Sequence, residues 1–338
     1  MPATTTATSV RWGVLSTSNI GLKVVAPAIA RADGAELVGI ASRTAGRAAE
    51  AAARLGLQRS YASYEDLLAD PDIDAVYIPL PNSLHKEWTV KALAAGKHVL
   101  CEKPLAASAA ECIEMHSASL AANRFVMEAF MYRHHPRMLA ARELIASGRL
   151  GQVRVVRSAF GFTVSDPLNI RFRPDLAGGA LMDVGCYCVD VARFLLDAEP
   201  ITANAQAVWS DSDIDLHLSG QLNFGTANLV FDCSLDTVRQ EFVEVVGTEG
   251  TMRIDAAFLP GTGDVEIQLN TRAGGAETLR FAGIDEYRLM AEHFSRAVLN
   301  GKDPGQSALN AAGGLAAIEA LHRSASSGGQ VSAVEVYY

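Results

Sequence analysis

Residues 97–104 read KHVLCEKP, and this stretch decides the fold. An apolar run ending at Cys101 is typical of a buried strand in a parallel sheet, and Glu102, Lys103 and Pro104 follow it. In open α/β sheets, ligands bind at the carboxyl ends of the strands. Burying an ammonium group without a partner costs several kcal/mol. The position of Lys103 therefore indicates an active site; the alternative is a surface lysine in an ordinary strand-to-helix loop.

Length and composition indicate a globular chain of two domains. The chain has 338 residues, of which 49% are hydrophobic, and a domain takes roughly 150 residues. We predict a disordered start over residues 1–9, a dinucleotide-binding domain over 10–150 and a second domain over 151–338. The net charge of −9 argues against a nucleic-acid or membrane-surface partner, because both select basic surfaces.

The cysteines and the first residues predict a cytoplasmic protein. The five cysteines are an odd number without a regular framework, which is typical of reduced thiols. Cys186 and Cys188 have no second pair beside them, so we expect no metal site. The first ten residues do not resemble a signal peptide, and no apolar run is long enough to span a bilayer.

Strands and helices alternate through the first half of the chain. We expect strands over 10–16, 37–41, 75–79, 97–101 and 125–130, with helices over 22–32, 44–55, 63–68 and 85–95. This alternation predicts βαβ units and a parallel sheet of the Rossmann type.

The first strand-to-helix turn is the expected phosphate site. At the three glycine positions of the dinucleotide fingerprint the chain has Ser16, Ser18 and Gly21. Serine is small and its hydroxyl can bind a phosphate oxygen, while the following helix offers amide groups to a pyrophosphate. The alternative is a plain tight turn. We assign the cofactor contacts of this turn to Ser16, Thr17, Ser18, Asn19 and Ile20.

The end of the second strand indicates the cofactor. An NAD enzyme places an acidic residue there to bind the ribose hydroxyl, but this chain has Ala41, Ser42 and Arg43. A guanidinium group suits a 2′-phosphate, so we predict NADP, with Ser42 and Arg43 binding it; the alternative is that Arg43 only begins the next helix. The stiff loop PLPNSLH, residues 79–85, follows the next strand. Its expected cofactor contacts are Leu80, Pro81, Asn82 and His85, although His85 alternatively lies in the first turn of a helix.

The second half predicts a different architecture. Short strands follow one another from residue 153 to 281, with a long helix expected over 180–196 and two more over 285–300 and 307–324. Asp183, Tyr187 and Asp190 are spaced to share one helix face. A polar stripe on an otherwise apolar helix is costly unless it lines a cavity; the alternative is a solvent-facing stripe.

These motifs together resemble the glucose-fructose oxidoreductase / inositol dehydrogenase / rhizopine-catabolism (Gfo/Idh/MocA) family. The resemblance rests on the serine-substituted turn, ASR, PLPNSLH, CEKP, MEAFMYRHHP at 127–136 and GGALMDVGCYCVD at 178–190. It implies an α/β fold: an N-terminal Rossmann domain, then an α+β domain with a large, open, mostly antiparallel sheet. One face of that sheet is expected to stay uncovered and apolar, which predicts a homodimer or larger homo-oligomer.

The resemblance also implies a reaction. Family members move hydride between NAD(P) and a sugar or polyol. Most carry histidine where this chain has Tyr187, and tyrosine resembles the branch of dihydrodiol and NADP-dependent D-xylose dehydrogenases. A free tyrosine has a pKa near 10, which a neighbouring ammonium group lowers. We assign Tyr187 as acid/base, and Lys103 as its cationic partner and as a donor to the substrate oxygen, so both residues are expected to bind the substrate; alternatively, Lys103 itself exchanges the proton while Tyr187 positions the substrate.

The remaining contacts complete the predicted site. Asp183 is expected to bind a neighbouring substrate hydroxyl, with Arg171 touching substrate or cofactor, and Glu102 joins Lys103 among the cofactor-binding residues. Within the oxidoreductase prediction, an aldose 1-dehydrogenase acting on D-xylose-like sugars leads. A ketoreductase of 1,5-anhydrofructose or deoxysugars comes next, and a trans-dihydrodiol dehydrogenase third. The alternative of another class is a non-catalytic NADP-binding regulator.

Overall fold

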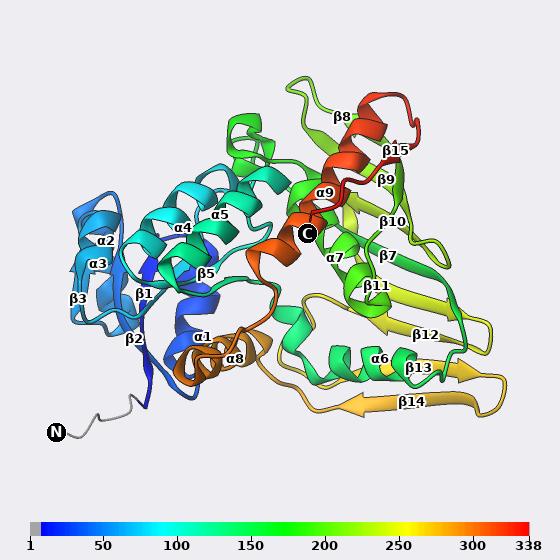
Figure 1. Cartoon of the computed structure of the whole chain (residues 1–338), viewed down its shortest axis with the longest axis horizontal. Helices are drawn as coiled ribbons and strands as arrows, with labels where there is room; N and C mark the ends of the chain where they lie inside the picture. Colours follow the sequence, from blue (N-terminus) through cyan, green and yellow to red (C-terminus); the bar gives the residue numbers. More distant parts are fainter. Residues whose placement is uncertain (1–7, 338) are drawn as a thin grey trace. The chain divides into compact units, whose positions relative to one another are not determined.

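The computed structural model describes residues 8–337, so most of the expected disordered start, residues 1–7, lies outside the described part. The chain forms two compact units (Figure 1). The first comprises residues up to 106, 110–131 and 285–311, and the second comprises 107–109, 132–284 and the residues from 312 onward. The boundary expected at residue 151 stays a prediction.

A six-stranded parallel sheet forms the first unit, in the order β3-β2-β1-β4-β5-β6. Its strands are β1 (Val10–Leu15), β2 (Ala35–Ala41), β3 (Arg59–Tyr61), β4 (Ala75–Ile78), β5 (His98–Cys101) and β6 (Val126–Glu128). Apolar residues fill β4 completely and most of β1, because helices cover both faces of the sheet. The order reverses between β1 and β4, as in a Rossmann fold, which confirms the predicted fold class of this half.

Two helices of the first unit begin at side-chain caps, Ser63 and Asp285. The helices of this unit are η1 (Gly21–Val25), α1 (Ala26–Ala30), α2 (Ala45–Leu55), α3 (Tyr64–Ala69), η2 (Asn82–Leu84), α4 (His85–Ala94), α5 (Ala109–Ala122) and α8 (Glu286–Asn300). Ser63 accepts a hydrogen bond from the Asp66 amide at the start of α3, as its sequence position predicts. The helix expected over 22–32 is a π-helical turn followed by α1, and Pro27 lies in the first turn of α1.

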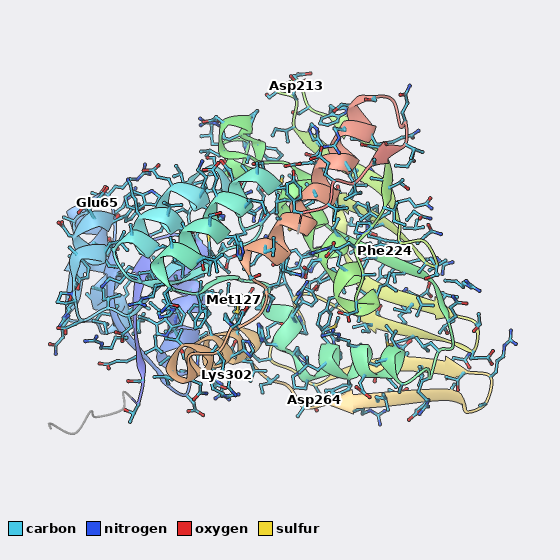
Figure 2. All side chains as sticks on the ribbon, viewed as in Figure 1. Glu65, Met127, Asp213, Phe224, Asp264 and Lys302 are labelled. Atoms are coloured by element: carbon cyan, nitrogen blue, oxygen red, sulfur yellow. The ribbon has the colours of Figure 1, made fainter. Side chains whose placement is uncertain are left out.

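A nine-stranded sheet forms the second unit, in the order β14-β13-β12-β11-β7-β10-β9-β8-β15. Its strands are β7 (Val153–Thr163), β8 (Thr202–Trp209), β9 (Asp215–Asn223), β10 (Asn228–Ser234), β11 (Asp236–Gly247), β12 (Gly250–Asp255), β13 (Val265–Thr271), β14 (Gly275–Phe281) and β15 (Ser332–Ala333). Asp213 and Phe224, labelled in Figure 2, lie just outside the two ends of β9. Among the described strands of this sheet only β7 and β10 pair in parallel, so the predicted mostly antiparallel sheet is confirmed.

The two faces of this sheet differ in polarity. Cross-strand pairing brings Leu229, Val156 and Val245 into one row, and all three are buried. In the row beside it Val230, 46% exposed, pairs with Arg157, which pairs with Glu244. This outer row thus mixes apolar and charged residues, so it is not uniformly apolar, contrary to the expectation for this face. The reason is that strand alternation gives the apolar positions to the core.

Helices cover the inner face of the nine-stranded sheet. They are α6 (Pro136–Ala146), α7 (Cys186–Leu196) and α9 (Ala308–Ser326), with shorter turns η3 (Met131–His134), η4 (Ile170–Phe172), η5 (Pro174–Leu176) and η6 (Leu181–Gly185). α7 packs on β7 and β10, beside α6. The helix expected over 180–196 is η6, a π-helical turn, continued by α7. Within residues 8–337, no helix is both long and apolar enough to cross a membrane.

Candidate active site

The turn after β1 offers unused backbone donors. In the described part of the chain, the amides of Thr17, Asn19 and Ile20 donate to no protein acceptor, whereas those of Ser18 and Gly21 donate to the hydroxyls of Ser16 and Ser18. A Cβ atom on Gly21 would lie 3.0 Å from Ser18 Oγ, so the turn is closely packed. Amides at a helix N-terminus bind anions. The turn therefore fits the pyrophosphate of a dinucleotide.

The end of β2 combines a buried hydroxyl with an exposed cation. Ser42 is 6% exposed, its amide donates to the Tyr61 carbonyl of β3, and its Oγ accepts from the Thr44 amide at 3.3 Å. Arg43 is exposed, and among the described residues its side chain forms no ion pair. A guanidinium group in this position is available to an anionic ligand.

The loop after β5 is tied to its neighbouring strands. The Glu102 amide donates to the Ile78 carbonyl of β4 at 3.1 Å. Tyr77 Oη, also on β4, donates to Glu102 Oε1 at 2.6 Å, and the Lys103 amide lies 3.3 Å from Glu102 Oε2. The carboxylate expected to contact the cofactor thus holds the backbone on which Lys103 stands; its cofactor contact stays a prediction.

Glu128 fixes the same loop from the next strand. Its carboxylate Oε1 accepts from the Leu105 amide at 2.8 Å, and the side chain is 3% exposed. Glu128 has no predicted role, although an acid at the carboxyl end of β6 is a usable signal, because the carboxyl ends of parallel strands meet at one edge of the sheet. Lys103 therefore stands on a loop that is anchored on both sides.

The loop after β4 places its predicted cofactor residues in different environments. Leu80 is 8% exposed, and the Leu84 amide donates to the Pro81 carbonyl, where Asn82 begins η2. His85 is fully buried as the first residue of α4, and its ring nitrogens lie against the carbonyls of Leu80 and Pro104. The ring of His85 thus bridges two loops of the protein, a role that the sequence did not predict. Its expected contact with the cofactor stays a prediction.

In the second unit, Tyr187 lies in an aromatic cluster. It is 5% exposed, and its ring centroid lies 5.2 Å from Phe258, 5.3 Å from Phe160 and 6.0 Å from Tyr132. Such packing fixes the ring. The tyrosine hydroxyl is therefore held at a defined place on α7.

The polar stripe on this helix is divided between two sets of partners. Arg171 Nε donates to Asp183 Oδ2 at 2.6 Å, so the arginine expected to touch a ligand directly is paired with the predicted substrate-binding carboxylate. Asp190, 3% exposed, instead accepts from Tyr132 and Arg133. Asp190 therefore joins α7 to the residues after β6 and is not part of a ligand-facing stripe in this unit.

A further carboxylate caps the helix that carries Asp183. Asp215, at the start of β9, accepts from the Leu181 amide at 2.6 Å. A Cβ atom on Gly179 would lie 2.0 Å from Asp215 Oδ1, so this position requires glycine. Burial raises the pKa of Asp215 to about 7. The sequence carried no signal for this contact, since the two segments are far apart in the chain.

Comparisons with known proteins agree with the fold described for the two halves of the chain. Residues 10–130 match an oxidoreductase family with an NAD-binding Rossmann fold, and residues 138–253 match a Gfo/Idh/MocA C-terminal domain. The chain is 41% identical over 323 residues to D-xylose 1-dehydrogenase (NADP(+)) 2 of Haloferax volcanii, covering 95% of this chain and 98% of the relative.

Two solved structures are similar over nearly their full length. The aldose-aldose oxidoreductase of Caulobacter crescentus, complexed with glycerol, is 28% identical with a TM-score of 0.88, covering 96% of this chain and 99% of that one. A 3-ketoreductase of Actinomadura kijaniata, in complex with NADP and TDP-benzene, is 28% identical with a TM-score of 0.86, covering 94% and 98%.

Proposed function

The chain belongs to the Gfo/Idh/MocA family of NAD(P)-dependent oxidoreductases acting on CH–OH groups, and we propose that it is an NADP-dependent aldose 1-dehydrogenase for D-xylose-like sugars. The proposed sugar substrate rests on the 41% identity, over nearly the whole chain, to a D-xylose 1-dehydrogenase. The observation that favours NADP is the end of β2, where Arg43 stands exposed in place of an acid.

The proposed roles follow from the chemistry of each side chain. The nicotinamide, when bound, takes or gives the hydride. Tyr187 then moves the proton of the substrate oxygen, and the Lys103 ammonium favours the tyrosinate. Asp183, held by Arg171, accepts from a neighbouring substrate hydroxyl. The alternative, in which Lys103 exchanges the proton and Tyr187 positions the substrate, predicts a different mutant pattern, given in the Discussion.

Turnover on a panel of substrates tests the proposal. The protein is incubated with NADP+ or NAD+ and with D-xylose, D-glucose, a polyol and a trans-dihydrodiol, and formation of the reduced cofactor is followed by absorbance. We expect the highest kcat/KM for D-xylose with NADP+. Turnover confined to the dihydrodiol would replace the aldose proposal by the dihydrodiol dehydrogenase alternative. Binding of NADP without turnover of any substrate would favour the regulator.

A second candidate function is a sugar ketoreductase. It is favoured by the similarity to the 3-ketoreductase of Actinomadura kijaniata. A ketoreductase reaction uses the same groups in the reverse direction, with Tyr187 giving the proton. Reduction of a 3-keto sugar by NADPH that is faster than any aldose oxidation would support it.

Assembly and location complete the proposal. We propose a homodimer or larger homo-oligomer through the outer face of the nine-stranded sheet, which mixes Val230 with Arg157 and Glu244. Light scattering at micromolar concentration tests it, and a monomer would refute it. The cytoplasmic location rests on the free cysteines, all five of which are buried, and also stays a proposal.

A further inference from the structure

The ring of His85 bridges two loops of the first unit. Its Nδ1 lies 2.9 Å from the Pro104 carbonyl oxygen, on the loop that carries Lys103. Its Nε2 lies 2.8 Å from the Leu80 carbonyl oxygen, on the loop after β4. The side chain is 0% exposed, so water does not compete for either contact.

Both ring nitrogens of His85 lie against carbonyl oxygens, which only accept hydrogen bonds. A ring nitrogen can therefore bond its carbonyl only when it carries a proton. A neutral imidazole has one N–H and one lone pair, whereas an imidazolium has two N–H groups. Burial lowers the pKa of His85 below its ordinary value, although the carbonyls of Pro104 and Leu80 act against burial, and the nearby Lys103 charge lowers it further. The neutral ring therefore dominates at pH 7, and it donates to one of the two carbonyls at a time.

Only the Nδ1 contact reaches the Lys103 loop, because Pro104 directly follows Lys103 in the chain. A neutral ring can carry its single proton on Nδ1 and donate it to the Pro104 carbonyl.

We propose that His85 is a positioning residue for Lys103, whose loop it holds by donating from Nδ1 to the Pro104 carbonyl. Glu102 and Leu105 are already bonded to β4 and β6, and His85 adds an anchor from α4 directly after the lysine. A displacement of about 1 Å in a reacting group costs on the order of 10²-fold in rate. The inference rests on the proposed function only in giving Lys103 a part in the reaction.

Three substitutions separate the two ring contacts. His85→Asn places an amide nitrogen near the position of Nδ1, His85→Gln places one near Nε2, and His85→Ala removes both. We expect kcat to fall roughly 10- to 100-fold in the Ala and Gln variants and to stay within about threefold of the wild type in the Asn variant. The dissociation constant for NADP is expected to stay within about threefold in all three, because the ring contacts protein carbonyls.

A second readout needs neither cofactor nor substrate. Hydrogen–deuterium exchange of the Glu102, Lys103 and Leu105 amides is expected to accelerate in the Ala and Gln variants, but not in the Asn variant. The matched control is His98, the first residue of β5: its Nδ1 accepts from the Phe125 amide at 3.0 Å, at the end of the strand opposite to Lys103. His98→Asn and His98→Ala are expected to leave exchange of these amides and kcat unchanged.

The outcomes distinguish the alternatives. Rescue by Gln instead of Asn would make the Leu80 contact the important one and overturn the proposal. A common rise in the NADP dissociation constant would make His85 a cofactor contact, which also overturns it. If the Ala variant does not fold, the Asn and Gln pair still decides. A wild-type protein without turnover would refute the proposed function, while the exchange pattern would still test His85.

Discussion

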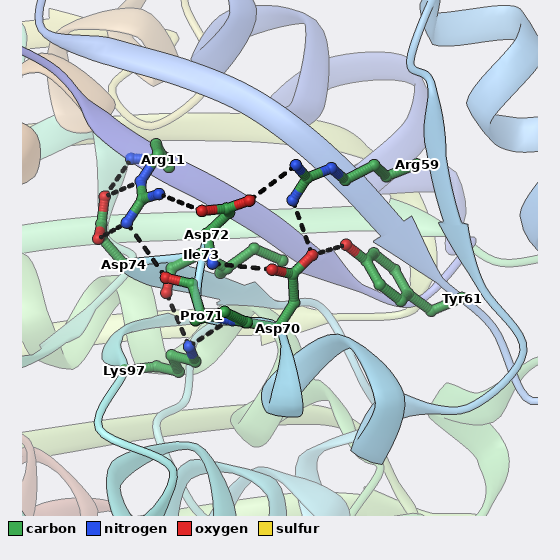
Figure 3. A network of polar contacts seen from close by, with 9 residues as sticks. All are labelled: Arg11, Arg59, Tyr61, Asp70, Pro71, Asp72, Ile73, Asp74 and Lys97. Atoms are coloured by element: carbon green, nitrogen blue, oxygen red, sulfur yellow. Dashed lines mark hydrogen bonds and ion pairs between the residues drawn. The ribbon is translucent and has the colours of Figure 1, made fainter.

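The two ends of the parallel sheet use charged residues in opposite ways. At the amino end, Arg11 binds Asp74 with its backbone amide, Nε and Nη2, at 2.8–2.9 Å, and Lys97 Nζ donates to the carbonyls of Asp70 and Ile73 (Figure 3). At the carboxyl end, Arg43 forms no ion pair with the described residues. The amino end thus compensates its own charges, which stabilises the fold. The carboxyl end leaves positive charge for a ligand.

The largest expected effect is on turnover at the carboxyl end. Lys103→Ala and Tyr187→Phe are each expected to lower kcat by roughly 10²–10⁴-fold, because general acid–base catalysis is worth about that much. Tyr187→Phe barely changes shape, and NADP binding is expected to survive in it. Steady-state kinetics measure the fall in kcat, and the melting temperature of each variant shows whether it is folded.

The double variant decides how the two residues act. Groups acting as a unit are not additive, so Lys103→Ala with Tyr187→Phe should be little worse than either single change. Near-normal turnover in Tyr187→Phe would move the proton chemistry to Lys103 alone. Fully additive losses would show that the two residues contribute independently.

The second effect concerns the choice of cofactor. Arg43→Ala is expected to weaken NADP binding by about 10- to 100-fold and NAD binding little, since a hydrogen bond to a charged group contributes about 1.5–3 kcal/mol. Fluorescence titration with both cofactors measures it. Arg47→Ala, four residues later in the first turn of α2 and also exposed, is the matched control. An equal loss for both cofactors would exclude a 2′-phosphate contact of Arg43.

The sequence predicted the carboxyl end better than the amino end. Residues such as Lys103 and Arg43 come just after apolar strands. The βαβ rule therefore predicts that they lie at the carboxyl edge of the sheet. The amino-end network joins residues from Arg11 to Lys97 through turns whose geometry no local pattern determines. The short strand β3, which contributes Arg59 and Tyr61 to this network, was missed for the same reason.

Contacts between residues far apart in the chain account for the other features that the sequence did not predict. Periodicity predicted the helix observed as α8 but not what it packs against; it returns to the first unit, where Ser295 accepts from Trp12 Nε1 on β1. Similarly, the helical spacing of Asp183, Tyr187 and Asp190 suggested one helix face for Asp183 and Asp190. The π-helical turn and the separate partners of each carboxylate divide them. Sequence spacing shows which residues are near along a helix, but partners from other elements decide where each side chain points.

A third effect compares Asp215, which forms no ion pair within residues 8–337, with the paired acids of the amino end. Burial raises the pKa of Asp215 to about 7, so the folded protein holds this proton more tightly than the unfolded chain does. Its contribution to stability is present in full below about pH 4 and is lost as the pH rises to about 7. We expect Asp215→Asn to become more stable relative to the wild type over this range, by on the order of 1 kcal/mol per pH unit.

Urea unfolding at several pH values measures this difference. Asp213→Asn, in the turn before β9 and exposed, is the control and should show no such trend. A stability difference between Asp215→Asn and the wild type that does not change with pH would mean that the carboxyl group is ionised in the folded protein throughout.

The smallest effect is expected at the amino end. Desolvation acts to raise the pKa of Asp74, but its bonds from Arg11 outweigh desolvation, and the net pKa is lowered. The carboxylate therefore stabilises the fold above about pH 4, and this contribution is lost as the pH falls through its lowered folded value. Because its side chain is 34% exposed, we expect Asp74→Asn to lower the free energy of unfolding by only about 1 kcal/mol at pH 7.

Turnover and NADP affinity should not change in Asp74→Asn, because the network lies at the opposite end of the strands from Lys103. Asp72→Asn is the matched control: Asp72 also pairs with Arg11, at 2.9 Å, but is 53% exposed, so its loss should cost less than Asp74→Asn. A fall in kcat with an unchanged melting temperature would mean that the amino end is coupled to the reaction. The division of the sheet into a stabilising end and a ligand-binding end would then be wrong.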